Sequence, residues 1–180
     1  MLNIRKDNLE KIAVFAIYGL LLGGFPYALA NASAEEPTQA VVVQVPVDPL
    51  EKYKGATKLS DTDLVELLSA VGFEGKALKV AYAVAKKESN GRPLAHNGNQ
   101  HTGDNSYGIF QINMIADLGA DRREKFNLKS NTQLFDPVVN AKIAFFMTGG
   151  GEDWSSWKIV PGQNNGERYQ QYLKEFAGLH

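Results

Sequence analysis

The first residue whose type and position could do chemistry is Glu88, at the end of a helical pattern. Apolar residues recur at helical spacing on one face of this segment: Ala77, Val80, Ala81, Val84 and Ala85. Glu88 continues that face, just before Asn90-Gly91 and Pro93 end the helix. Partial desolvation and the negative end of the helix dipole should both favour its protonated form. A protonated carboxyl group can donate a proton to a leaving group. On helical position alone, the simpler alternative is that Glu88 turns to water or pairs with a nearby lysine.

A second motif follows a polar, glycine-rich stretch from Gly91 to Asn105, which we expect to form a hairpin or an irregular loop. The motif reads Ser106-Tyr107-Gly108-Ile109-Phe110-Gln111-Ile112-Asn113. Residues 107–113 alternate enough in polarity to predict one extended segment. The motif therefore presents a glycine and two carboxamide side chains downstream of Glu88.

Glu88-Ser89-Asn90 and the 106–113 motif together resemble the lysozyme-like superfamily of peptidoglycan lyases and hydrolases. The closest resemblance is to the soluble lytic transglycosylase (SLT) domain, including its versions in phage virions. In these families a glutamate ends a helix before a small residue, and a glycine, two apolar residues, a glutamine and often an asparagine follow. The resemblance covers about residues 60 to 160, including Val71 to Gly75 and Trp154-Ser155-Ser156-Trp157. It implies an α+β, mostly α, lysozyme-like domain with a small β-rich insertion.

The resemblance implies that Glu88 is catalytic and that a set of residues binds substrate: Ser89, Ser106, Tyr107, Gly108, Gln111, Asn113 and Trp154. Gly108 lets a backbone approach a sugar closely because no Cβ intervenes. Gln111 and Asn113 offer donors and acceptors for hydroxyl and N-acetyl groups, although strand-edge or turn hydrogen bonding is the alternative. Tyr107 could orient the substrate or pack in the core. The two tryptophans could line a cleft or form one inward helical turn.

Ser106 is the position at which this sequence differs from chicken-type lysozymes in a way that bears on the reaction. Chicken-type lysozymes carry a second carboxylate at this position, whereas lytic transglycosylases manage with one catalytic glutamate. Asp104, two residues earlier, could still supply a second catalytic carboxylate. The simpler interpretation is that Asp104 is a turn residue in Gly103-Asp104-Asn105.

Composition limits the function classes. The net charge is −1 and the pI about 6.3, so no basic character favours nucleic acid as a partner. The chain has no cysteine, which excludes disulfides, thiolate metal sites and cysteine catalysis. His96 and His101 lie in a loop with no third ligand type at metal spacing, so we expect no metal and no cofactor.

The N-terminus predicts export. Arg5, Lys6 and Lys11 precede an apolar run from Ile12 to Ala30, with small residues up to Ala34. Residues 1–34 are therefore interpreted as a signal peptide, or alternatively as a retained membrane anchor. Residues 35–58, with three prolines, predict a linker or a surface strand, and residues 59–180 the domain. The domain is then periplasmic or extracellular, or virion-associated if phage-encoded, and contacts membrane only through an uncleaved N-terminal segment.

Helices are predicted where caps and apolar periodicity agree. Ser60 to Asp63 forms a capping box before a helix ending at Gly72, and a second helix runs over about 74–89. Asp136-Pro137 begins another, with Val139, Ile143, Phe146 and Met147 inward. A last helix places Tyr169, Tyr172, Leu173 and Phe176 on one face.

The sequence thus predicts an enzyme that cleaves the β-1,4 bond between N-acetylmuramic acid and N-acetylglucosamine and leaves a 1,6-anhydro end. A hydrolytic lysozyme using the same acid is the first alternative. An inactive glycan-binding or assembly module in an envelope complex or virion is the second, and an intact Glu88 argues against it. The expected partner is the peptidoglycan glycan strand.

Overall fold

The computed structural model describes residues 47–179 of the chain. Five α-helices and a small sheet follow one another in the order α1 (Asp61–Val71), α2 (Gly75–Ser89), β1 (His96–Asn97), β2 (Ser106–Tyr107), β3 (Ile112–Asn113), α3 (Ala116–Lys125), α4 (Pro137–Met147) and α5 (Glu167–Ala177). The predicted α+β, mostly α, fold with a small β-rich insertion is confirmed. The predicted export segment, 1–34, lies outside the described residues. Within residues 47–179, none of the helices combines the length and the apolarity needed to cross a membrane.

The first two helices begin and end where their capping residues predict. The Ser60 hydroxyl accepts a hydrogen bond from the Asp63 N–H at 3.1 Å, and the Asp63 carboxylate accepts one from the Ser60 N–H at 3.0 Å. This reciprocal pair is the predicted capping box of α1. At the other end of α2, Asn90 adopts the left-handed conformation, with φ 57°, which stops the helix directly after Ser89.

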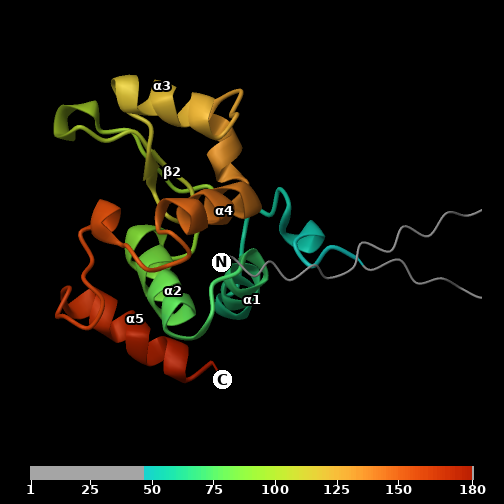
Figure 1. Cartoon of the computed structure of the whole chain (residues 1–180), viewed down its shortest axis with the longest axis vertical. Helices are drawn as coiled ribbons and strands as arrows, with labels where there is room; N and C mark the ends of the chain where they lie inside the picture. The colour runs from blue at the N-terminus through green and yellow to red at the C-terminus, as the bar shows by residue number, and fades with distance from the viewer. Residues whose placement is uncertain (1–46, 180) are drawn as a thin grey trace, which may run out of the picture. The chain divides into compact units, whose positions relative to one another are not determined.

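Helix α2 lies at the centre of the hydrophobic core. Its residues from Val80 to Ala85 are all buried. It packs against α5 and α1, while the sheet and α3 lie on the far side of α4, at the top of the view in Figure 1. The aromatic face of α5 is buried as predicted through Tyr169, Tyr172 and Phe176. Core packing therefore holds both faces of the helix that ends near Glu88.

The three strands form an antiparallel sheet in the order β1-β2-β3. Tyr107 pairs with His96 on one side, and Ser106 pairs with Asn113 on the other. The prediction of one extended segment over residues 107–113 is wrong, because a turn separates β2 from β3. Gly108 and Gln111 both have positive φ, 75° and 47°, and the Gln111 N–H donates to the Gly108 carbonyl at 3.1 Å. The apolar residues of the motif, Ile109 and Phe110, are buried in this turn.

Helix α4 begins as predicted, but one of the four residues predicted to face inward is exposed. The Asp136 carboxylate accepts hydrogen bonds from the Val138 and Val139 N–H groups, and Pro137 is the first helical residue. Phe146, predicted to face inward, is 60% exposed. Its ring instead meets Phe126 edge-on at 5.5 Å between centroids. Ile143 is buried as predicted, and Val139 and Met147 are partly buried against the core. Small and polar residues that an apolar pattern does not register are buried on the same helix or at its C-cap: Asn140, Ala141, Ala144 and Thr148.

The compact domain begins before the predicted boundary at residue 59. Leu50 and Tyr53, within the predicted 35–58 linker, are buried in the core. The Tyr53 hydroxyl also donates to the Glu66 carboxylate of α1 at 2.7 Å. The part of that linker up to residue 46 lies outside the described residues. Helix α3 is absent from the sequence predictions because only its Gly119 is buried, so it carries no apolar stripe.

Candidate active site

A cleft of about 590 Å³ lies at the C-terminal end of α2. Its walls come from α2, the sheet and its loops, α3, the end of α4 and the 3-10 helix η4 (Ser155–Trp157). The residues that line it are Lys87, Glu88, Asn97, Asp104, Ser106, Gln111, Asn113, Leu118, Arg122, Met147, Ser156, Trp157 and Lys158. The fold therefore brings Glu88 together with Ser106, Gln111 and Asn113 from the second motif.

Glu88 combines partial burial with an ion pair. Its side chain is 23% exposed, and Lys87 Nζ lies 2.8 Å from its Oε1. The preceding residues on the same face, Val84 and Ala85, are fully buried. Glu88 thus lies at the cleft and also pairs with a neighbouring lysine, which is the simpler alternative drawn from its helical position. Partly exposed pairs contribute about 0–1 kcal/mol, so a ligand can displace this one at little cost.

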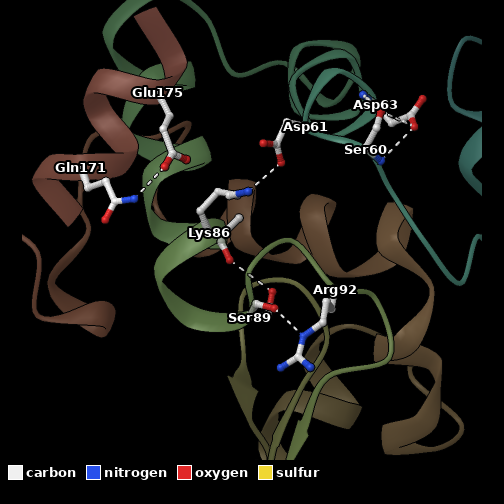
Figure 2. Close-up of polar contacts among 9 residues, drawn as sticks. Ser60, Asp61, Asp63, Lys86, Ser89, Arg92, Gln171 and Glu175 are labelled. Carbon is white, nitrogen blue, oxygen red and sulfur yellow. Dashed lines mark hydrogen bonds and ion pairs between the residues drawn. The ribbon is translucent and has the colours of Figure 1, made fainter. Parts of the chain in front are cut away.

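The end of α2 is held by contacts on the side away from the cleft. Figure 2 shows Lys86 reaching Asp61 at the start of α1, with Nζ 2.7 Å from Oδ1. The Lys86 side chain is buried, and its ammonium also lies over the Tyr172 ring of α5 at 5.6 Å from the centroid. Arg92 Nε donates to the Ser89 carbonyl at 2.9 Å (Figure 2). These contacts connect the last turn of α2 to α1, to α5 and to the following loop, which restricts where Glu88 can point.

Ser89, a predicted substrate-binding residue, lies outside the cleft lining. Its hydroxyl is buried and lies 2.8 Å from the Ile109 carbonyl and 3.1 Å from the Ala85 carbonyl, either of which can accept its proton. Ser89 therefore joins the end of α2 to the turn between β2 and β3. The structure supports a positioning role, in which Ser89 keeps Glu88 in register with the second motif.

We expect Ser89→Ala to lower the free energy of unfolding by about 1–2 kcal/mol, because the Ile109 carbonyl loses a buried donor. KM should change by less than about twofold, since the side chain lines no part of the cleft. Urea unfolding and steady-state kinetics on solubilised glycan measure the two effects. A large rise in KM with unchanged stability would instead mean that Ser89 binds substrate.

Gly108 is required by protein packing, which differs from the predicted close approach of a sugar. A Cβ at this position would lie 2.2 Å from Asn140 Nδ2 and 2.2 Å from the Leu134 carbonyl oxygen. Gly108 is buried, and its positive φ is also one that L-residues rarely adopt. The glycine therefore lets the turn pack against α4.

Asn140 is the residue that organises this turn, and the sequence analysis did not identify it. It is fully buried; its Oδ1 accepts from the Phe110 N–H, and its Nδ2 donates to the Tyr107 and Leu134 carbonyls, all at 2.9 Å. One side chain thus satisfies three backbone groups around the motif. A single carboxamide among the apolar residues of a helix was the signal available in the sequence.

The two carboxamides of the motif do line the cleft, but both also hold the loops together. Gln111 Nε2 donates to the Ala95 and Gly108 carbonyls, at 3.1 and 2.9 Å, which leaves its Oε1 to accept from a ligand. Asn113 Oδ1 accepts from the Asn105 and Ile115 N–H groups, both at 3.1 Å, and its Nδ2 donates to the Gly103 carbonyl. One Asn113 N–H proton remains for a sugar.

Ser106 and Asp104 lie together on the wall formed by the sheet and its loop. The Ser106 hydroxyl is buried and lies 3.4 Å from Asp104 Oδ1. Asp104 is half-buried and also accepts from the Thr102 hydroxyl at 3.2 Å. The cleft therefore contains a second carboxylate besides Glu88, supplied by Asp104 instead of by position 106.

The two tryptophans have different environments. Trp154 is 1% exposed and donates from Nε1 to the Gly151 carbonyl, so it packs in the core and does not line the cleft. Trp157 lines the cleft, and its Nε1 donates to the Phe110 carbonyl at 2.7 Å. The aromatic wall predicted for Trp154 is thus provided by its neighbour, which is bonded directly to the second motif.

Tyr107 also lies outside the cleft lining. Its ring packs against His96, at 4.5 Å between centroids, and against Phe135, at 5.3 Å. This places the tyrosine among the residues that hold β1 to β2. The histidine considered as a metal ligand accordingly stacks on an aromatic ring, and its Nε2 lies 3.2 Å from Asn105 Oδ1.

Three cations line the cleft without having been singled out from the sequence: Lys87, Arg122 and Lys158. Arg122 comes from α3, and its guanidinium donates to the Asn113 carbonyl. Burial lowers the pKa of Arg122, but a guanidinium starts so far above neutrality that it stays charged. No sequence pattern marks Arg122, because α3 carries no helical stripe that would orient it.

Comparison with known proteins agrees with this geometry. A family model of the SLT type, described as a lysozyme-like domain, matches residues 65–159, which is more than half of the chain. The matched range includes Glu88, the whole 106–113 motif and Trp157. Neither the curated proteins nor the solved structures provide a significant match. The chain belongs to the lysozyme-like domain family, whose members cleave glycans.

Proposed function

We propose that this protein is a lytic transglycosylase that cleaves the β-1,4 bond between N-acetylmuramic acid and N-acetylglucosamine in peptidoglycan. The observation that carries the proposal is the position of Glu88, half-buried at the wall of a cleft that it shares with Ser106, Gln111 and Asn113. Membership of a glycan-cleaving family supports the substrate class. A module that only bound glycan would have no need of a partly buried acid at this position.

In the proposed reaction, protonated Glu88 donates its proton to the glycosidic oxygen as the bond from that oxygen to the muramyl C1 breaks. The resulting carboxylate then takes the proton from the muramyl C6 hydroxyl, whose oxygen bonds to C1. The products are a free N-acetylglucosamine hydroxyl and a 1,6-anhydromuramyl end, and Glu88 is protonated again. Lys87, 2.8 Å away in the free protein, must release the carboxyl group before the first step and can stabilise the carboxylate between the two.

Intramolecular attack suits this cleft because the C6 hydroxyl is already attached to the reacting sugar. Its use avoids the entropic cost of recruiting and positioning a water molecule. Ser106 cannot replace a carboxylate as nucleophile, since its hydroxyl is not ionised and no histidine among residues 47–179 lines the cleft to take its proton. In this reaction one residue, Glu88, is sufficient, because it serves first as the acid and then as the base.

A hydrolytic lysozyme is the second candidate, and Asp104 is the observation that favours it. Its carboxylate lines the same cleft as Glu88 and could activate water or stabilise an oxocarbenium-like centre. The hydrogen bonds from Thr102 and Ser106 would hold that carboxylate in place. In this alternative Asp104 is essential, whereas the transglycosylase needs it only to support the loop.

The product distinguishes these candidates. We expect mass spectrometry of digested sacculi to show 1,6-anhydromuramyl ends, lighter than reducing ends by one water molecule. Asp104→Asn should retain activity within about tenfold, because the amide oxygen can still accept one of the two hydrogen bonds that Thr102 and Ser106 donate to separate carboxylate oxygens. Predominantly reducing ends, together with loss of activity in Asp104→Asn, would establish the hydrolase instead. Export through residues 1–34 remains part of the proposal, and N-terminal sequencing of protein from producing cells tests it.

A further inference from the structure

A second hollow, of about 370 Å³, adjoins the cleft between α3 and the end of α4. Four residues line both the cleft and the hollow, so the two form one continuous surface: Leu118, Arg122, Met147 and Ser156. A ligand bound beside Glu88 can therefore extend into the hollow without leaving the protein surface. The proposed reaction uses none of the groups that belong to the hollow alone.

The hollow is apolar and cationic. Phe146 is 60% exposed there and lies against Phe126. Lys125 Nζ lies over the Phe146 ring, 4.9 Å from its centroid, and forms no ion pair within residues 47–179. Among the described residues that line the hollow, Asp121 is acidic, and Arg122 and Lys125 are cationic. An exposed aromatic ring beside Lys125, which forms no ion pair within residues 47–179, indicates a ligand with both apolar and anionic groups.

A glycan strand without peptides has only part of this chemistry. Its hydroxyl and N-acetyl groups are uncharged and match the carboxamides of the cleft, Asn97, Gln111 and Asn113. Its one anionic group, the lactyl carboxylate of each muramyl residue, stays close to the sugar ring and carries no apolar side chain. The peptide arm on the lactyl group of each muramyl residue differs, because it carries free carboxylates and aliphatic side chains. Arg122 lies at the junction of cleft and hollow, where such an arm would branch from the bound sugar.

We propose that the hollow binds the carboxylate-bearing peptide arm of a muramyl residue held in the cleft. The inference rests on the proposed function, because the arm reaches the hollow only from a bound glycan. Lys125 pairs with a peptide carboxylate, and Phe146 packs against the apolar part of the arm. The enzyme then prefers glycan strands that carry peptides over strands from which an amidase has removed them.

The test compares kcat/KM on peptide-bearing strands and on amidase-stripped strands of the same length distribution. We expect the parent protein to favour peptide-bearing strands by about fivefold or more, the scale of a pairing with a partly exposed charge together with apolar contact. In Lys125→Glu and in Phe146→Ser this preference should fall to about one to twofold. Lys142→Glu, an equal charge change at an exposed position of α4 that lines neither surface, should keep the parental preference.

The outcomes separate the inference from the function on which it rests. Equal cleavage of both substrates by the parent protein overturns the peptide site and leaves the transglycosylase standing. Equal loss of preference in Lys125→Glu and Lys142→Glu also overturns it, because net charge alone would then explain the effect. Failure to cleave either substrate overturns the proposed function itself. Far-UV circular dichroism of each variant ensures that folded proteins are compared.

Discussion

Replacing Glu88 with glutamine is expected to lower the rate of glycan cleavage by roughly 10²-fold to 10⁴-fold, the usual contribution of a positioned general acid. The amide has nearly the same shape but has no acidic proton to donate and cannot act as the base for the C6 hydroxyl. Stability should change little, because the Lys87 pair is partly exposed and such pairs contribute about 0–1 kcal/mol. Initial rates on labelled sacculi at equal concentrations of folded protein measure the effect.

Glu152→Gln is the matched control for this experiment. Glu152 is exposed and lines no part of the cleft, so the same chemical change there should leave the rate within about twofold of the parent. Equal activity of Glu88→Gln and the parent protein would show that Glu88 is not the acid. The assignment would then pass to Asp104, the other carboxylate in the cleft.

The largest effect on stability is expected for Asn140→Leu, which should lower the free energy of unfolding by about 3 kcal/mol or more. Leucine removes the partner of three buried backbone groups: the Phe110 N–H and the Tyr107 and Leu134 carbonyls. Each buried polar group left without a partner costs about 1–3 kcal/mol. The turn between β2 and β3 should loosen, and with it the positions of Gln111 and Trp157.

Chemical denaturation, with thermal melting as a second readout, measures this loss. Asn164→Leu is the control, because Asn164 is an exposed loop residue and its replacement should change stability by less than about 0.5 kcal/mol. A change below about 1 kcal/mol in Asn140→Leu would contradict the organising role assigned to Asn140.

Local signals accounted for most of the helices. The Ser60 capping box, the Asn90 stop after Ser89 and the Asp136-Pro137 start all depend on residues adjacent in sequence, and each lies where it was predicted. The sheet turn was misjudged because alternation of polarity cannot distinguish a strand from a turn whose apolar residues insert into the core. Phe146 was placed inward because the pattern ignored Asn140 and Thr148, two polar residues that are buried.

The cleft required long-range information. Glu88, Ser106, Gln111 and Asn113 were identified from their motifs, and they do meet in one cleft. Gly108 and Trp154 belong to the same motifs but pack inside the protein, because a motif records structural needs as well as contacts with substrate. Arg122 and Lys158 reach the cleft only through the packing of α3 and η4, which no local pattern encodes.

The central claim, that Glu88 directs attack by the substrate's own hydroxyl, is tested most directly by digesting sacculi in water labelled with heavy oxygen. Transglycosylation forms the new bond at the muramyl C1 from the C6 oxygen, so the account predicts newly formed muramyl ends without label. Hydrolysis takes that oxygen from solvent. Incorporation of one heavy oxygen at each new muramyl end would contradict the account.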